Sequence, residues 1–292
     1  MEYAFSASNI LEIASLNKGY RDFQLRDINL ALPKGSIMGL IGENGAGKTT
    51  TIKLILNLIR RDSGKITLFG QDNSKDEKLV KEHIGVVLDE SCFHDTLNAR
   101  EISGILNGVY TKRWDAPLFR RYLDQFSLPE KKVVKEYSRG MKMKLSIAAA
   151  LAHHPRLLIL DEATSGLDPV VRAEILDEFF AFIQDEENGI LMSSHITSDL
   201  EKVADYVTFL HKGRVALAGA KDRILEEHAV VKCGASDYDR MDKSMIVGVR
   251  KNSFGCEALT SNKKELARRY PQLALDAATL EDIMLYYAKG EK

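Results

Sequence analysis

Short apolar runs recur along the first 220 residues of the chain, each bounded by polar or turn-forming residues. They are Ile37–Ile41, Ile84–Leu88, Leu157–Leu160 and Ile190–Met192. Apolar residues in unbroken succession, without the alternation of a half-exposed strand, are typical of strands buried on both faces. The pattern therefore predicts a sheet of largely parallel strands that is covered by helices.

Between these runs, apolar residues recur at spacings of three and four positions, which predicts helices. In the range Lys48–Ile59 they are Ile52, Ile55, Leu56 and Ile59. A second helix is predicted to begin at Pro169, because proline is favoured in the first helical turn. Its apolar residues are Ile175, Leu176, Phe179 and Ile183. Strands that alternate with helices favour an α/β fold.

Two segments depart from this alternation. From about residue 93 to 154 the pattern is almost purely helical. Beyond about residue 220 it predicts two short strands and two helices, at Val230–Cys233, Met245–Val249, Lys263–Tyr270 and Leu280–Ala288. We therefore expect a main domain over 1–220, with a helical subdomain at about 93–154, and a small C-terminal accessory domain over 221–292.

The composition is that of a soluble globular protein. The 292 residues are 45% hydrophobic and 28% charged, and 41 basic against 42 acidic side chains give a net charge of −1. These values argue against a disordered chain and provide no overall charge that would attract nucleic acid or an anionic membrane. Three cysteines without a CxxC pair argue against a disulfide framework or a zinc site. We also expect no signal peptide and no membrane-spanning helix.

The segment Gly42–Thr49 matches the phosphate-loop pattern G-x-x-x-x-G-K-[ST], and it lies between a predicted strand and a predicted helix, as that loop requires. Its glycines allow backbone N–H groups to point at a phosphate, and the helix N-terminus adds the positive end of its dipole. Lys48 would reach the β- and γ-phosphates, and the Thr49 hydroxyl would bind Mg²⁺. The predicted nucleotide-binding residues are Gly42, Asn44, Gly45, Ala46, Gly47, Lys48, Thr49 and Thr50.

Two carboxylates, Asp161 and Glu162, follow the apolar run Leu157–Leu160. Asp161 at the tip of the strand suits a partner of Mg²⁺, and Glu162 is placed to polarise an attacking water as a general base. Acidic residues often end strands, so this signal is specific only in combination with the phosphate loop. Together the two motifs predict a magnesium–nucleotide site.

Three further motifs resemble those of the ATP-binding cassette (ABC) family, specifically the nucleotide-binding subunit of a transporter. Tyr137–Met141 is similar to the family's LSGGQ signature, with Ser138 and Gly140 matching; Ala163–Asp168 is similar to the D-loop; and His195 ends a strand, as the family's switch histidine does. The resemblance covers roughly residues 5–220. It implies a phosphate-loop NTPase (RecA-like) core with an N-terminal antiparallel β subdomain and a helical insertion, to which the pattern beyond residue 220 adds a small C-terminal α+β accessory domain.

The resemblance also assigns roles to these motifs. Ser138 and Gly140, at the start of a helix, would contact the γ-phosphate of an ATP held by an opposing cassette. Two cassettes would then pair head to tail around two nucleotides, as a homodimer or with a different cassette. His195 would act as a γ-phosphate sensor beside the catalytic Glu162, and Asp168 would join the nucleotide-binding residues.

Two positions fit the family pattern less closely. Tyr20 resembles the aromatic residue that stacks on adenine, with a simple packing role as the alternative. Family members usually carry a glutamine at the end of the strand Ile84–Leu88, in contact with Mg²⁺ or its water, and this chain has Asp89 there. Aspartate can accept a hydrogen bond from water bound to Mg²⁺, but it is shorter and adds a negative charge. The resemblance places Asp89 in the metal site and leaves the Mg²⁺ affinity open.

The function implied is that of an ATPase subunit of a bacterial exporter. It would work with a separate membrane-spanning permease at the cytoplasmic face of the cell membrane. The Y-S-R-G-M form of the signature resembles that of exporters of drugs or antimicrobial peptides. One alternative is a soluble cassette protein without a permease, in repair, translation or assembly; another is an interaction module that has lost hydrolysis. Basic residues near the signature lack interleaved aromatic residues, so we expect no nucleic-acid partner.

Overall fold

The structure is a computed structural model that describes residues 8–75, 77–89, 92–252 and 255–289. Within these residues the strands form three sheets, with the orders β2-β1-β4-β5, β10-β9-β3-β8-β7-β6 and β12-β13-β11-β14. The strands of the first two sheets are β1 (Asn9–Gly19), β2 (Gln24–Pro33), β3 (Ser36–Gly42), β4 (Ser63–Leu68), β5 (Gln71–Asp72), β6 (Ile84–Val87), β7 (Leu157–Asp161), β8 (Gly189–Ser194), β9 (Tyr206–His211) and β10 (Arg214–Ala220). The predicted α/β class is confirmed.

The central sheet contains all four strands that the apolar runs predict. β6, β7, β8, β3 and β9 pair in parallel, and β10 is added antiparallel at one edge. Every residue of β3, β7 and β8 is buried. Alternate residues of β7 face two separate hydrophobic clusters: Leu158 and Leu160 belong to one, and Leu157 and Ile159 to the other. Burial on both faces explains why these strands have no polar alternation.

The first of these clusters is formed with helices from the middle of the chain, and the second with the N-terminal sheet. The helices that contribute are α1 (Lys48–Ile55), α3 (Ala99–Val109), α4 (Ala116–Gln125), α5 (Arg139–Leu151), α6 (Pro169–Phe182) and α7 (Thr197–Val203). α1 packs in the second cluster with β1 and β2, and the others pack in the first. The antiparallel N-terminal sheet implied by the family resemblance is thus present and covers one face of the central sheet.

Helix α1 is shorter than the periodicity predicts. It ends at Ile55, whereas the apolar spacing continues to Ile59. Asn57 has a positive φ of 52°, a left-handed conformation that stops the helix. Ile59 still packs against the second cluster from the turn that follows. The prediction of a helix over Lys48–Ile59 was therefore wrong in its last four residues, because periodicity records burial and not backbone conformation.

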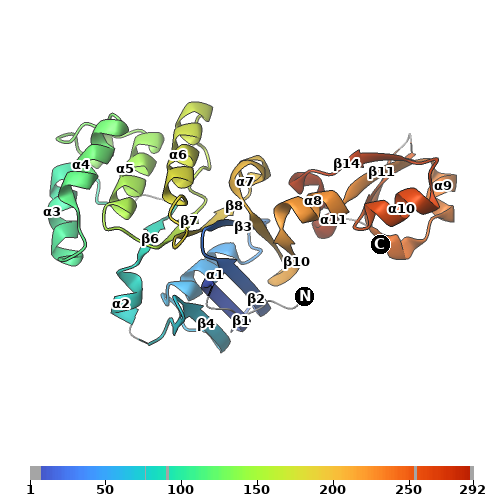
Figure 1. The fold of residues 1–292 in the computed structure, drawn as a ribbon, viewed down its shortest axis with the longest axis horizontal. Helices are drawn as coiled ribbons and strands as arrows, with labels where there is room; N and C mark the ends of the chain where they lie inside the picture. The colour runs from blue at the N-terminus through green and yellow to red at the C-terminus, as the bar shows by residue number, and fades with distance from the viewer. Residues whose placement is uncertain (1–7, 76, 90–91, 253–254, 290–292) are drawn as a thin grey trace.

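The helical segment predicted at about 93–154 contains α3, α4 and α5, with a short α2 (Glu77–Lys81) before it. Asn98 begins α3 with a capping box, in which its side chain accepts from the Glu101 N–H and the Glu101 carboxylate accepts from the Asn98 N–H. Figure 1 shows α3, α4 and α5 gathered at one end of the long axis of the molecule, next to β6. Among the described residues, no helix is long and apolar enough to cross a membrane.

The third sheet lies at the opposite end of the long axis (Figure 1). Its elements, with the helices around them, are α8 (Lys221–Glu227), β11 (Ala229–Cys233), α9 (Ala235–Arg240), β12 (Ile246–Asn252), β13 (Gly255–Thr260), α10 (Lys263–Arg269), β14 (Ala274–Ala277) and α11 (Leu280–Lys289). β13 and β14 were missed in the sequence, because no strong apolar run marks them. β10 ends at Ala220, which supports our proposal of a boundary between 220 and 221.

The C-terminal segment is not isolated from the main core. Leu280 and Ile283 of α11 belong to the same cluster as the central sheet, and the Leu280 N–H donates to Oε1 of Glu201 at 2.6 Å.

Two cysteines lie side by side in the third sheet. The register of β11 and β13 pairs Cys233 directly with Cys256, and both thiols are free. Burial raises the pKa of the Cys233 thiol. Cysteines that lie 23 positions apart in sequence are therefore cross-strand neighbours.

Candidate active site

An open hollow of about 670 Å³ lies at the carboxyl edge of the central sheet. It is large enough for a nucleotide, since ligand pockets commonly span 300–1,000 Å³. Ten residues predicted for the site line it, namely Asn44, Gly45, Gly47, Lys48, Thr49, Thr50, Asp89, Asp161, Glu162 and His195. Asp22, Phe23, Glu43 and Ser165 line it as well. The carboxyl edge of a parallel sheet is where α/β proteins bind ligands, so fold and motif indicate the same place.

The phosphate loop connects β3 to α1, and two of its glycines are required by the packing. A Cβ on Gly42 would lie 2.6 Å from the Leu210 carbonyl oxygen. Gly47 has a φ of 112°, and a Cβ there would lie 2.5 Å from Leu25. Gly47 also begins α1 without a side-chain cap, so backbone N–H groups at this helix N-terminus remain available for an anion.

Lys48 is buried beneath this loop, with 6% of its surface exposed. Its Nζ donates to the Gly42 carbonyl oxygen at 2.7 Å and lies 3.3 Å from Oε1 of Glu162. A buried ammonium group needs such partners, because desolvation without them is costly. The same Nζ is thus held between the phosphate loop and the predicted general base.

Asp161 and Thr49 form a pair of oxygen ligands at the bottom of the hollow. Thr49 Oγ1 donates to Asp161 Oδ2 at 3.0 Å, and Ser193 Oγ donates to Asp161 Oδ1 at 2.5 Å. Ser193 reaches Asp161 because the register of β7 and β8 makes the two residues direct partners. Ser193 therefore orients the Asp161 carboxylate, a role that we did not predict from the sequence.

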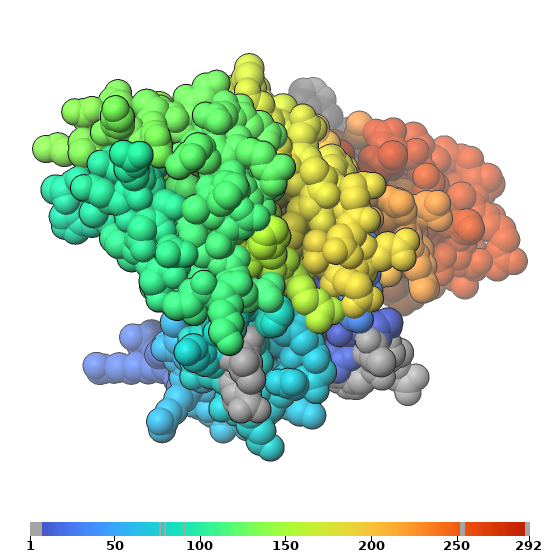
Figure 2. All heavy atoms as spheres, turned by 60° about the vertical axis from the view of Figure 1, so that its left-hand side comes forward, coloured from blue at the N-terminus to red at the C-terminus, as the bar shows by residue number. Residues whose placement is uncertain are grey.

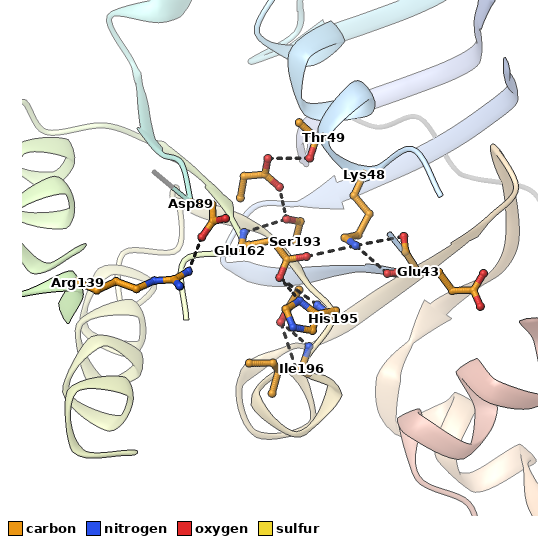
Figure 3. Close-up of polar contacts among 12 residues, drawn as sticks. Glu43, Lys48, Thr49, Asp89, Arg139, Glu162, Ser193, His195 and Ile196 are labelled. Atoms are coloured by element: carbon orange, nitrogen blue, oxygen red, sulfur yellow. Dashed lines mark hydrogen bonds and ion pairs between the residues drawn. The ribbon is translucent and has the colours of Figure 1, made fainter. Parts of the chain in front are cut away.

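Glu162 takes a left-handed backbone conformation, with φ of 55°. Its N–H donates to the carbonyl oxygen and to Oγ of Ser193, both at 3.1 Å. Its Oε2 lies 2.5 Å from Nδ1 of His195 and accepts from the His195 N–H at 3.3 Å. Figure 3 shows Glu162 between Lys48 and His195. Strained backbone of this kind is common at functional sites, where the surroundings hold a side chain in one position.

The oxygen atoms of Thr49 and Asp161 fit Mg²⁺, which binds through one or two carboxylates together with water and phosphate oxygens. In the part of the chain that the structure describes, no group of three or more His, Cys, Asp or Glu could hold a metal ion by itself. An Mg²⁺ ion at this site would thus be bound jointly by the protein, water and the nucleotide. When bound, it neutralises phosphate charge and polarises the phosphoryl oxygens.

Phe23 is an aromatic residue beside the phosphate loop. It lines the hollow, and its Cζ lies 3.0 Å from the position of a Cβ on Gly47. Tyr20, in the same turn between β1 and β2, is 45% exposed and has Lys18 Nζ at 5.5 Å from its ring centre, and it does not line the hollow. Stacking on adenine thus remains a prediction for Tyr20, and Phe23 is a second candidate.

Ser138, Gly140 and Asp168 lie outside the hollow. Ser138 is the N-cap of α5, as predicted, and its Oγ accepts from the Met141 N–H at 3.3 Å. Asp168 is the N-cap of α6 and accepts from two backbone N–H groups, both at 3.1 Å. A Cβ on Gly140 would meet Val171 of α6 at 3.3 Å. Contact of these three residues with a nucleotide stays a prediction, and it requires an opposing cassette.

Two departures from the family signature have structural partners. Tyr137 is buried, and its hydroxyl donates to the Pro129 carbonyl oxygen at 2.7 Å; burial raises its pKa. Nη2 of Arg139 donates to Oδ1 of Asp89 at 2.7 Å (Figure 3). Asp89 itself lines the hollow, and its contact with a metal stays a prediction. The sequence did not single out Phe23, the contact of Ser193 with Asp161, or the contact of Arg139 with Asp89.

Fold and site thus define a phosphate-loop nucleotide-binding protein, and comparison with known proteins gives its family. The family model described as ABC transporter matches residues 25–165. The bacitracin transport ATP-binding protein BcrA of Bacillus licheniformis is 37% identical over 214 residues, which are 71% of this chain and 69% of that protein. The lantibiotic transport ATP-binding protein SrtF of Streptococcus pyogenes is 34% identical over 71% of this chain and 90% of its own length.

A solved structure agrees with these sequence relatives. It is described as the ATP binding subunit of an ABC transporter, is 29% identical, and covers 74% of this chain and 92% of its own with a TM-score of 0.68. The chain belongs to the ATP-binding subunits of ABC transporters, a family that hydrolyses ATP to power transport. The predicted family, ATP binding and ATPase activity are confirmed.

Proposed function

We propose that this chain is the ATPase subunit of a bacterial exporter that moves antimicrobial peptides of the bacitracin or lantibiotic kind. The observation that carries the proposal is the 37% identity to a bacitracin transport ATP-binding protein, in a chain that keeps the complete hydrolytic set. That set consists of Lys48, Thr49, Asp161, Glu162 and His195, which line one hollow. A module that had lost hydrolysis would have no need of Glu162 held in a strained conformation.

Within the site, Lys48 and the phosphate-loop N–H groups bind the β- and γ-phosphates, and Thr49 and Asp161 hold Mg²⁺. Glu162 accepts a proton from the attacking water, and His195 keeps its carboxylate in place through the contact at 2.5 Å. Proton transfer by a positioned carboxylate accelerates hydrolysis by roughly 10²–10⁴-fold. Ser138, Gly140 and Asp168 complete the site of a second cassette, which is either a copy of this chain or a related one.

The partner that carries the peptide is a separate membrane-spanning permease, and this chain binds it at the cytoplasmic face of the membrane. α3 supports this assignment, because Ile105 and Val109, which share one face of the helix, are 52% and 63% exposed. Leu88, directly after β6, is 40% exposed. Figure 2 shows the helical segment (green) as a broad surface above the N-terminal elements (blue to cyan). We assign the permease contact to this surface.

The experiment is to express the chain with the membrane protein encoded next to it and to purify the pair through a tag on this chain. We expect co-purification, and an ATPase rate that rises when bacitracin or a lantibiotic is added to the reconstituted pair. The Glu162→Gln variant should co-purify equally and show no such rise. A chain that hydrolyses ATP alone, binds no membrane protein and ignores both peptides would instead be a cassette protein without a permease.

A further inference from the structure

Asp89 lies on the boundary between two hollows of the protein surface. One is the nucleotide hollow, and the other, of about 490 Å³, is lined by Leu88, Asp89, Asp95, Tyr137, Arg139, Lys142, Met143 and Ser146. Arg139, the first residue of α5, reaches Asp89 from the second hollow and does not line the first. In Figure 3 the guanidinium group of Arg139 approaches Asp89 from the side away from Lys48.

The charges around the nucleotide hollow bear on the ion pair between Arg139 and Asp89. Among the described residues, five carboxylates line it, those of Asp22, Glu43, Asp89, Asp161 and Glu162, against one ammonium group, that of Lys48, and the imidazole of His195. Lys48 already lies 3.3 Å from Glu162. A polyphosphate is itself strongly anionic, so each carboxylate that faces it without a countercharge weakens its binding. The countercharge of Asp89 comes from outside the hollow, through Arg139 at 2.7 Å.

Arg139 has a second neighbour besides Asp89. A Cβ on Gly166 would lie 2.6 Å from Nη1 of Arg139, so the guanidinium group lies against the backbone of the D-loop segment. Gly166 also has a positive φ of 67°, which disfavours other residues. Arg139 thus contacts the segment after β6 on one side and the segment before α6 on the other.

We propose that Arg139 is a positioning residue of the ATP site. Its positive charge cancels the negative charge of Asp89, so that the edge of the nucleotide hollow at Asp89, here called the rim, carries no net charge that would repel polyphosphate. The inference rests on the proposed nucleotide-binding role of the hollow. It predicts opposite effects for the two members of the pair. Loss of Arg139 leaves a bare carboxylate that repels ATP, whereas loss of the Asp89 charge leaves a cation that attracts it. A pair that served only the fold would weaken binding in the same direction from either side.

The chain offers a matched control on the same helix. Lys142 lies one turn after Arg139, and its Nζ is 3.2 Å from Oδ1 of Asp95. Both residues line the second hollow, and neither lines the nucleotide hollow. Lys142→Gln therefore removes a comparable exposed ion pair between the same two segments and leaves the charge at the nucleotide rim unchanged.

The experiment measures the affinity of the full chain for ATP in EDTA, which removes any effect of Mg²⁺, at low salt and again at about 0.5 M salt. At low salt we expect Arg139→Gln to bind ATP about fivefold more weakly than wild type, which corresponds to about 1 kcal/mol, the repulsion between two like unit charges about 4 Å apart in water. Asp89→Asn should bind at least as tightly as wild type. The affinity of the double variant for ATP should return to within about twofold of that of wild type. Lys142→Gln should bind ATP as tightly as wild type does. High salt should shrink the Arg139→Gln defect, because it screens exposed charges.

The proposal would be overturned by an Arg139→Gln variant that binds ATP as wild type does, or by a double variant as weak as Arg139→Gln alone. A defect in Arg139→Gln that does not change with salt would also contradict it, because a structural role is not screened. Failure of the proposed nucleotide site itself is distinguishable. In that case wild type, and not only the variants, would bind no ATP.

Discussion

The Nδ1 atom of His195 lies 2.5 Å from the Oε2 atom of Glu162, across 33 positions of sequence. The contact exists because β7 and β8 are parallel neighbours whose carboxyl ends meet at one edge of the sheet. Glu162 Oε1 lies 3.3 Å from Lys48, so each carboxylate oxygen has its own partner. A carboxylate held in this way is already oriented for proton abstraction, and such orientation makes a general base effective.

We predict that Glu162→Gln retains ATP and loses hydrolysis. Glutamine has nearly the same shape and can still contact Lys48 through its carbonyl oxygen, but it does not accept a proton at neutral pH. The rate constant for hydrolysis should fall by about 10²–10⁴-fold, with ATP affinity changed by less than about threefold. Single-turnover hydrolysis and equilibrium binding measure the two quantities. Unchanged turnover would exclude Glu162 as the base.

We predict that Lys48→Ala weakens the binding of ATP itself. Its ammonium group is buried and aimed at the loop, so the variant removes charge-assisted hydrogen bonds to phosphate worth about 3 kcal/mol, or about a hundredfold in affinity. Lys53→Ala is the control, because Lys53 is an exposed residue of the same helix and does not line the hollow. Calorimetric titration with ATP tests both. Normal ATP affinity in Lys48→Ala would contradict the phosphate-loop assignment.

The choice between Tyr20 and Phe23 as the adenine contact can be decided with two alanine variants. Because Phe23 lines the hollow and Tyr20 does not, we expect Phe23→Ala to weaken ATP binding about tenfold, which matches typical stacking energies. Tyr20→Ala should weaken it less. Binding of inorganic tripolyphosphate, which has no base, should be the same in both variants. A larger loss in Tyr20→Ala would instead support the role implied by the family resemblance.

Stability should fall on acidification because of His153. This histidine is buried, its Nε2 lies 3.1 Å from the Ile84 carbonyl oxygen, and its ring stacks on Tyr110. Burial lowers its pKa from 6.5 to about 4. The unfolded chain therefore binds the additional proton between these values, so the stabilisation is complete above about pH 6.5 and is lost as the pH falls toward 4.

The cost to the free energy of unfolding is about 3 kcal/mol over that range. Chemical denaturation at pH 7, 6, 5 and 4 measures it. His153→Gln keeps a donor for the Ile84 carbonyl oxygen but cannot titrate, so it should show a correspondingly shallower loss. His94→Gln, at an exposed position, should follow wild type. Identical curves for wild type and His153→Gln would contradict this role of His153.

The C-terminal elements show which helices and strands the spacing of apolar residues can predict. Lys263–Tyr270 and Leu280–Ala288 are present as α10 and α11 within one residue at either end. β14 was missed because it is an edge strand with mostly exposed residues, which leaves little hydrophobic pattern to detect. β13 is an interior strand with mostly buried residues, and it was missed because Glu257 interrupts its short apolar run. The spacing of apolar residues indicates which side of a helix or strand is buried. It gives no signal where neither side is buried.

The sequence by itself determined the buried parallel strands and the phosphate loop, because both depend on residues that are contiguous in the chain. An unbroken apolar run needs a sheet covered on both faces, and the run from Gly42 to Thr49 has one loop geometry available to it. Only the tertiary structure decided that Ser193 orients Asp161, that Arg139 pairs with Asp89, and that Phe23 lines the hollow. These contacts join separate elements, and they are set by strand register and helix packing, on which local patterns carry no information.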